Sequence, residues 1–568
     1  MTNLIVEYSL IFSTYTALFI FFALSGRSLI LLTSYLFTKQ FKIPNEIFNT
    51  KSSIFYPIFG YFIVGNLLVI FNFFVPLNSP IVILGYGILI VLNLISFDLN
   101  NLKLSLDLQK IVFHFLIPLI LLVSTFDLNF HYDAAFYHLN HQNWLRESNI
   151  VIGMVNIFWP YGIGSINEYV SAIFWGKTSL VNIHYLSIIF LNVFFNFLFF
   201  HIRKTKNTPY TFPSVFILLF GFLDNFGFDG GRNGFLYIQE LGKQDLQVST
   251  LVILSSLIIC NWIIKRQFDL IEVVLITYII LLSFQLKIGG ITPAFLLIYF
   301  FIYSFRNNLL NIRNFLYSSL PAGFFLIIWT IKSYLISGCF VFPVNTTCIN
   351  NFNWYRDGST KFIEEYTSQT SLAFQSYFAD PQENIFTWFN YFFYQNEPFS
   401  SFYRSYYSNF FLSLFILFLI KKIFTTKKEN YRSKEVLVYV LGSLLFLIMF
   451  GPIPRYTSGI LTLSAALIGL NVLDFKKQLN TNIYYFVFLL TLALVPRLNS
   501  YLSAIENQNI ALPDPRFEWN YDENKLNDFW ISPIATDICW INLYCTSEIG
   551  GRIELTEGYY KTITRYLD

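Results

Sequence analysis

Apolar runs long enough to cross a membrane recur along most of this chain, and the short polar stretches between them hold most of the Lys and Arg. A spanning helix needs roughly 20 largely apolar residues, and about 14 such runs are present. We place them at 9–37, 52–76, 80–97, 109–125, 180–201, 213–223, 247–264, 270–285, 289–305, 315–336, 408–422, 435–451, 458–474 and 481–497. The pattern predicts an all-α polytopic membrane protein.

The composition agrees with this interpretation and excludes a water-soluble protein. Hydrophobic residues make up 55% of the 568 positions and charged residues only 12%, whereas a soluble domain carries about twice that charged fraction. The formal net charge of +3 is too small over this length to indicate a nucleic-acid partner. The expected partner is therefore the lipid bilayer.

The basic residues orient the predicted spans, because short loops rich in Lys and Arg remain in the cytoplasm. Five basic loops fall on one side, at 203–206, 265–266, 306–313, 421–434 and 476–477. The long polar segments fall on the opposite side, at 126–178, 224–246, 337–407 and 498–568. We expect a multi-pass protein of the cytoplasmic (inner) membrane whose active face is outside the cytoplasm. Arg27 leaves the topology of the first span open.

These boundaries divide the chain into five predicted parts: N-terminal membrane helices 1–108, a membrane core 109–336 with the first outer loop 126–178, an outer segment 337–407, C-terminal membrane helices 408–497, and an outer C-terminal cap 498–568. The cap is too short to bury a large core of its own. We therefore expect it to pack against the 337–407 segment.

Four cysteines lie in the predicted outer segments, where disulfides persist if the compartment is oxidising. Cys339 and Cys348 share one segment and Cys539 and Cys545 share another, while Cys260 is inside a span. Four cysteines allow three pairings. Local pairing within each segment is the expectation, and small buried thiols are the alternative.

The first outer loop carries the residues most suited to chemistry, two carboxylates and two histidines directly after a predicted membrane helix. These are Asp127, His131, Asp133 and His138. A carboxylate at a membrane–water boundary is partly desolvated, which raises its basicity and suits it to accept a proton from a hydroxyl. The simpler alternative is that Asp127 caps a helix and the other residues solvate the loop.

Other common chemistries lack their motifs. The glycine-rich stretch around Arg232, at 230–234, lacks the Lys-Ser/Thr that cradles nucleotide phosphates. The centres of nearly all predicted spans are free of charge, which is not typical of secondary transporters. Lys332, near the outer end of its span, is expected to extend its ammonium to the interface.

Several sequence pieces, taken in order, resemble one family of membrane enzymes. They are the outer-loop Asp followed by Tyr137-His138-Leu139, the turn Gly242-Lys243-Gln244-Asp245, Lys287 after a span, Ser337 to Pro343 with Trp354 beyond it, and Pro452-Ile453-Pro454-Arg455-Tyr456. Together they resemble GT-C-fold glycosyltransferases, and most nearly the uncharacterised bacterial members related to aminoarabinose transferases and protein O-mannosyltransferases. Phe340 replaces a proline of the family pattern, and Asp127 and Asp133 replace its adjacent acidic pair.

The resemblance implies transfer of a sugar from a polyprenyl-phosphate donor to a hydroxyl of a glycan, lipid or protein acceptor, for cell-surface glycan or glycolipid synthesis. Asp133 is the first candidate for the catalytic base and Asp127 the second. On a helix, Asp133 shares a face with Tyr137 and His138. Arg455 is the favoured phosphate contact.

Further candidates for substrate contact are Lys287, Arg232, Lys243, Asp245, Glu168, Glu240 and Trp354. His131, His138 and His141 are weak candidates for metal ligands, because their spacing matches no strong motif, and no cofactor is expected. Two other functions stay open. One is a polysaccharide polymerase or ligase. The other is a lipid-linked glycan flippase or assembly scaffold, which predicts a cationic cavity deep among the helices.

Overall fold

The computed structural model describes residues 2–41, 53–95, 111–176, 180–202, 208–223, 238, 240–241, 243–355, 359–373, 385–395, 399–423, 433–450, 454–472, 488, 491, 494–507, 525–526, 528–531, 539–547 and 551–566. Most of these residues are helical. The main helices are α1 (Thr2–Phe41), α3 (Tyr56–Asn72), α4 (Pro80–Ile95), α6 (Ile117–Leu122), α9 (Val181–Ile202), α10 (Thr211–Leu223), α11 (Asp245–Lys265), α12 (Leu270–Leu286), α13 (Thr292–Arg306), α14 (Ile312–Ser337), α17 (Phe399–Ile423), α18 (Lys434–Phe450) and α19 (Pro454–Val472).

Shorter elements complete the fold. The remaining α-helices are α7 (Leu139–Glu147), α8 (Ile166–Ile173), α15 (Ser359–Ala373), α16 (Ile385–Asn390) and α21 (Leu498–Asn507). The strands are β1 (Asn129–Phe130), β2 (Glu240–Leu241), β3 (Lys525–Leu526), β4 (Phe529–Ile531), β5 (Cys545–Thr546), β6 (Arg552–Thr556) and β7 (Thr562–Tyr566). They form the small sheets β1-β2, β3-β4-β5 and β6-β7.

The helices have the apolar character that a membrane protein requires. Within the described residues, five are long and apolar enough to span a bilayer, namely Leu4–Leu36, Val181–Ile202, Asp245–Lys265, Ile288–Arg306 and Ile312–Ser337. The first thirteen predicted spans each coincide with a helix in the described residues, although several of these helices have only 10–17 residues. The last predicted span, 481–497, lies largely outside the described residues.

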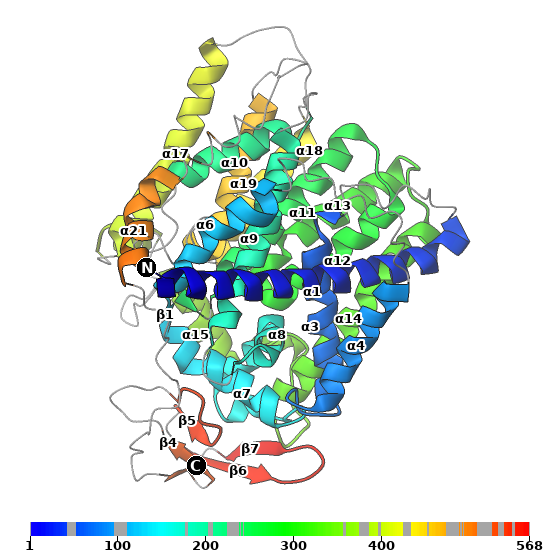
Figure 1. The fold of residues 1–568 in the computed structure, drawn as a ribbon, viewed down its shortest axis with the longest axis vertical. Helices are drawn as coiled ribbons and strands as arrows, with labels where there is room; N and C mark the ends of the chain where they lie inside the picture. The colour runs from blue at the N-terminus through cyan, green and yellow to red at the C-terminus, as the bar shows by residue number, and fades with distance from the viewer. Residues whose placement is uncertain are drawn as a thin grey trace.

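Helix α1 runs across the bundle and packs directly on α3 (Figure 1). Two glycines allow this contact. A Cβ on Gly26 would lie 1.9 Å from the carbonyl oxygen of Tyr56, and a Cβ on Gly60 would lie 1.8 Å from that of Phe22. Small residues let apolar helices approach at the backbone where no hydrophobic force drives association.

The C-terminal segment packs on the first outer loop, which differs from the expected contact with 337–407. The backbone NH of Ile152 donates to Lys561, and that of Ile563 donates to Ile152, both over 2.9 Å. A small second core buries side chains of the loop and of the cap together, including Met154 and Phe529. The cap strands bury their apolar side chains against this loop and against Ile336 at the end of α14, a contact between distant segments that leaves no pattern in the sequence. In Figure 1 the loop and the cap lie at one end of the molecule.

Both disulfides are local. Cys339 and Cys348 are joined by an S–S bond of 2.04 Å, and Cys539 and Cys545 by one of 2.11 Å. Cys260 is a buried free thiol. The first bridge closes a short loop at the end of α14, and the second lies within the cap.

Candidate functional site

A short parallel strand pairing joins the first outer loop to the segment that precedes α11. Asp127 ends a 3-10 turn, and β1 then pairs with β2, with Asn129 opposite Glu240 and Phe130 opposite Leu241. The backbone NH of His131 donates to Leu241 over 3.3 Å. This pairing brings the turn before α11 next to the residues that follow Asp127.

Asp133 forms an ion pair with Lys243. The distance from Nζ to Oδ2 is 2.6 Å, and the Asp133 side chain is 23% exposed whereas that of Lys243 is 5% exposed. His131 Nδ1 accepts the Asp133 backbone NH over 3.0 Å, and its Nε2 lies 3.8 Å from Glu240 Oε2. Asp133 and Glu240, with side chains 23% and 24% exposed, are thus partly open to solvent, whereas His131 and Lys243 are buried.

Glu168, at the start of α8, is a buried carboxylate with three side-chain donors around it. His138 Nδ1 lies 2.5 Å from Oε1, Gln142 Nε2 lies 2.9 Å from Oε2, and Gln244 Nε2 lies 3.0 Å from Oε1. Burial works to raise the pKa of Glu168, but the charge of His138 and the hydrogen bonds with His138 and Gln142 act against it, and the pKa is held below its ordinary value.

The turn 243–245 joins these groups, because each of its three consecutive side chains contacts a charged partner. Lys243 contacts Asp133, Gln244 contacts Glu168, and Asp245 forms an ion pair with Lys287, the residue after α12. Asp245 also lies in the first turn of α11, where a carboxylate is favoured by the helix dipole. We call these six residues the charged junction.

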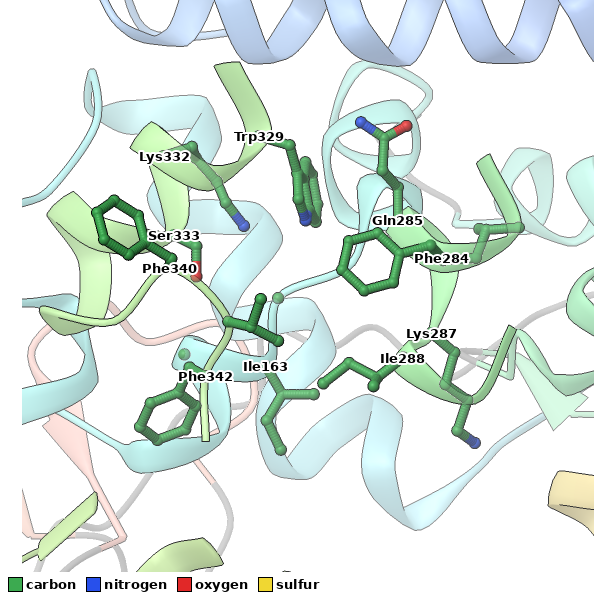
Figure 2. Close-up of a pocket in the computed structure, with 14 residues that line it drawn as sticks. Ile163, Phe284, Gln285, Lys287, Ile288, Trp329, Lys332, Ser333, Phe340 and Phe342 are labelled. Carbon is green, nitrogen blue, oxygen red and sulfur yellow. The ribbon is translucent and has the colours of Figure 1, made fainter. Parts of the chain in front are cut away.

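A small, partly open hollow lies beside the charged junction, with a cavity volume of about 30 Å³. The aromatic walls are Phe284, Trp329, Phe340 and Phe342, and the polar groups are Gln285, Lys287, Lys332 and Ser333 (Figure 2). Lys287 belongs both to the hollow and to the charged junction. The hollow therefore borders the residues that the resemblance assigns to chemistry.

Other predicted site residues lie around this group. Asp127 is half-buried at the end of the 3-10 turn. Tyr137 and His138 have ring centroids 4.0 Å apart, within a π-helical turn over Ala134–His138 rather than the expected α-helix. Trp354 stacks on Phe352, with centroids 4.7 Å apart.

The side chains of two predicted cations, Arg455 and Arg232, lie outside the described residues. Arg455 lies in the first turn of α19, and its side chain is outside the described residues. Arg232 lies in 224–237, also outside them. Among the residues that the structure describes, no three His, Cys, Asp or Glu side chains are grouped so that they could hold a metal ion. His131 and His138 contact carboxylates, and His141 packs beside Tyr161.

Sequence reasoning underestimated Glu168. Ser165 and Glu168 have the spacing of a helix-capping box, in which the Glu side chain turns back to the helix start. Ser165 does cap α8, since its hydroxyl accepts the Asn167 NH over 3.1 Å. The Glu168 carboxylate instead contacts His138, and no sequence signal distinguishes the two arrangements.

The comparisons with known proteins place the chain in a family without assigning an activity. No curated protein and no solved structure matches it significantly. A sequence family described as a domain of unknown function (DUF8201) matches residues 10–462. This match covers well over half of the chain, and the protein therefore belongs to the DUF8201 family.

Proposed function

We propose that the protein is a GT-C-type glycosyltransferase that moves a sugar from a polyprenyl-phosphate donor to a hydroxyl acceptor. The observation that carries the proposal is the charged junction. It joins three pieces of the resemblance that are far apart in sequence, namely the loop with Asp133, the turn 243–245 and Lys287. Their meeting at one end of an apolar helical bundle suits a reaction at a membrane surface.

In this proposal Asp133 removes the proton from the acceptor hydroxyl. The acceptor oxygen forms a bond to the anomeric carbon, and the bond between that carbon and the phosphate oxygen breaks. The electron pair leaves with the lipid phosphate, and the configuration of the sugar is inverted. Lys243 orients the Asp133 carboxylate through their 2.6 Å ion pair.

We assign stabilisation of the leaving phosphate to Arg455, because a guanidinium matches phosphate geometry. The packing of α19 supports this assignment. A Cβ on Gly459 would lie 2.9 Å from the Cα of Ser249. Gly459 is about one helical turn from Arg455, and Ser249 about one turn from Asp245. The second turns of α19 and α11 are therefore in contact, which supports a position of Arg455 near the start of α11.

The proposed topology has about 14 membrane spans. It counts the short helices as spans because they pack within the helical bundle. The charge distribution supports its sidedness. Helix α11 begins at Asp245 in the charged junction and ends next to Arg266, which interacts with Glu435 at the start of α18. Basic residues thus gather at the end opposite the charged junction. By the positive-inside rule that end is cytoplasmic and the junction faces outward.

Genetic complementation tests the proposal. A strain that lacks the protein should lose one sugar from a surface glycan or glycolipid, measured by mass spectrometry of the extracted envelope. The wild-type gene should restore the sugar, and Asp133→Asn should fail to restore it although it is expressed at the wild-type level.

Asp127→Asn is the matched control, since it neutralises the other carboxylate of the same loop. It should restore at least a tenth of the sugar. Full restoration by Asp133→Asn together with failure of Asp127→Asn would move the base to Asp127. No change of any surface sugar in the deletion strain would contradict the function itself.

A further inference from the structure

The disulfide of the cap closes the loop 539–545, which we call the disulfide loop. This loop packs on the part of the first outer loop that contains Asp133. The backbone NH of Trp540 donates to the carbonyl oxygen of Ala135 over 3.2 Å. The Trp540 ring meets that of Phe130 edge to face, with centroids 5.3 Å apart. In sequence, Asp133 therefore lies between the two residues that Trp540 contacts.

Two asparagines of α7 bind the next two residues of the disulfide loop. The carbonyl oxygen of Ile541 accepts from Asn143 Nδ2 over 2.8 Å, and that of Asn542 accepts from Asn140 Nδ2. Asn140 is fully buried, and its Oδ1 accepts the hydroxyl of Tyr161 over 2.7 Å. Residues three apart share one face of a helix. One face of α7 is therefore covered by the disulfide loop.

The opposite face of α7 is fixed by the charged junction. His138 and Gln142 are four residues apart, and both contact the buried carboxylate of Glu168. Helix α7 continues directly from the turn Ala134–His138, and Asp133 is the N-cap residue of that turn. The backbone that carries Asp133 is thus attached to a helix that is held on both sides.

The disulfide loop presents its backbone groups to α7 in one particular conformation. Trp540 has a φ of 51°, which is strained for a bulky side chain and persists only where the surroundings enforce it. The bridge supplies this constraint locally, because a cross-link removes alternative conformations of the loop that it closes. Cys539 and Cys545 are 3% and 2% exposed, so the bridge lies within the packed cap.

We propose that the disulfide loop positions Asp133 for proton transfer, with Trp540, Asn140 and Asn143 as the positioning residues. The inference rests on the proposed function, because it takes Asp133 as the base. The three residues act through the backbone on either side of Asp133 and through α7. Without the bridge, the carboxylate occupies its reactive position in a smaller fraction of molecules, and kcat falls while donor binding is kept.

Hydrogen exchange measured by mass spectrometry on the purified full-length protein in detergent tests the contact without an assay of activity. The variant Cys539→Ala/Cys545→Ala keeps the buried positions apolar. Its backbone amides in 134–147 should exchange at least tenfold faster than in wild type, because local opening needs less free energy. The amides of α9, within the helical bundle, should exchange as in wild type and show that the variant is folded.

Sugar transfer from the lipid-linked donor tests the consequence for Asp133. The variant Cys539→Ala/Cys545→Ala should lower kcat at least tenfold and leave the KM for the donor within about threefold, because a small misplacement of a reacting group is costly. Asn143→Ala removes one hydrogen bond and should lower kcat about fivefold. Asn143→Gln keeps the amide donor and should recover part of this loss.

Asn149→Ala is the matched control. Asn149 Nδ2 also donates to a cap carbonyl, that of Tyr559 over 2.7 Å, but Asn149 follows α7 and lies far in sequence from Asp133. This variant should keep the kcat of wild type. A loss in Asn149→Ala equal to that in Asn143→Ala would overturn the proposal, because it would assign the effect to docking of the cap in general.

Three other outcomes decide between this inference and the proposed function. Unchanged exchange in 134–147, or an unchanged kcat, in Cys539→Ala/Cys545→Ala would overturn the inference and leave the function standing. A higher KM with unchanged kcat would also overturn it, because it would assign the loop to substrate binding. Absence of sugar transfer by wild type would reject the proposed function, and faster exchange in the variant would then support only the positioning of 134–147 by the disulfide loop.

Discussion

His141 shows how burial sets the protonation of a single residue beside the charged junction. Its ring is 1% exposed and packs against Tyr161, with centroids 5.5 Å apart. Burial lowers the pKa of His141 to about 4, and Lys332 acts in the same direction, while Glu168 opposes both. The folded protein therefore keeps His141 neutral at pH values where the unfolded chain would protonate it.

This difference predicts a pH dependence of stability. Between pH 6.5 and pH 4 the unfolded chain binds a proton at His141 that the folded chain does not bind, so stability falls as the pH falls through this window. The loss from this residue is about 3 kcal/mol at pH 4. Between pH 7 and pH 4, the thermal unfolding temperature should therefore fall less for His141→Gln than for wild type. A His141→Gln profile identical to wild type would contradict the prediction.

The individual residues of the site could be predicted from sequence better than their partners could. Asp133 was a candidate as a carboxylate of the first outer loop, and Lys243, Asp245 and Lys287 were candidates through the family resemblance. Their ion pairs depend on the two-residue pairing of β1 with β2, which is too short to leave a pattern. The inward direction of Lys332, which is only 2% exposed, could not be predicted either, since the same sequence position allows an interfacial lysine.

At the scale of elements, the contact between α1 and α3 depends on two glycines. The predicted spans located both helices, because long apolar runs are the strongest signal in a membrane protein. Their crossing was not predictable, since glycines recur throughout the chain and only the fold decides which of them meet a neighbouring backbone. Gly26 and Gly60 do so, whereas a Cβ on Gly323 of α14 would meet nothing within 4 Å.

Gly60→Ala should consequently separate α1 from α3. Its Cβ would overlap the carbonyl oxygen of Phe22, and overpacking of this kind costs about 1–3 kcal/mol. The thermal unfolding temperature in detergent should fall by several degrees. Gly323→Ala should leave it unchanged or slightly raised, because alanine favours a helix more than glycine does. Equal unfolding temperatures for Gly60→Ala and Gly323→Ala would refute the close contact.

At the scale of the whole molecule, the account requires the cap and the charged junction to lie outside and the basic loops inside. The two disulfides and the buried Cys260 leave no exposed thiol among the described cysteines, so single added cysteines report sidedness. A maleimide that cannot cross membranes should label Glu557→Cys in intact spheroplasts, because this cap residue has a 64% exposed side chain. It should label Arg313→Cys only after permeabilisation, and the reverse pattern would show that the bundle is inverted.

The central claim is that the protein transfers a sugar from a lipid phosphate with Asp133 as the base. The most direct measurement incubates purified protein with a lipid extract from its own cells and an envelope acceptor fraction, followed by mass spectrometry of the lipids. We predict that one lipid-linked sugar decreases with wild-type protein, that the free lipid phosphate increases by the same amount, and that Asp133→Asn leaves both unchanged. Persistence of every lipid-linked sugar in the presence of wild-type protein, or equal consumption by Asp133→Asn, would contradict the account.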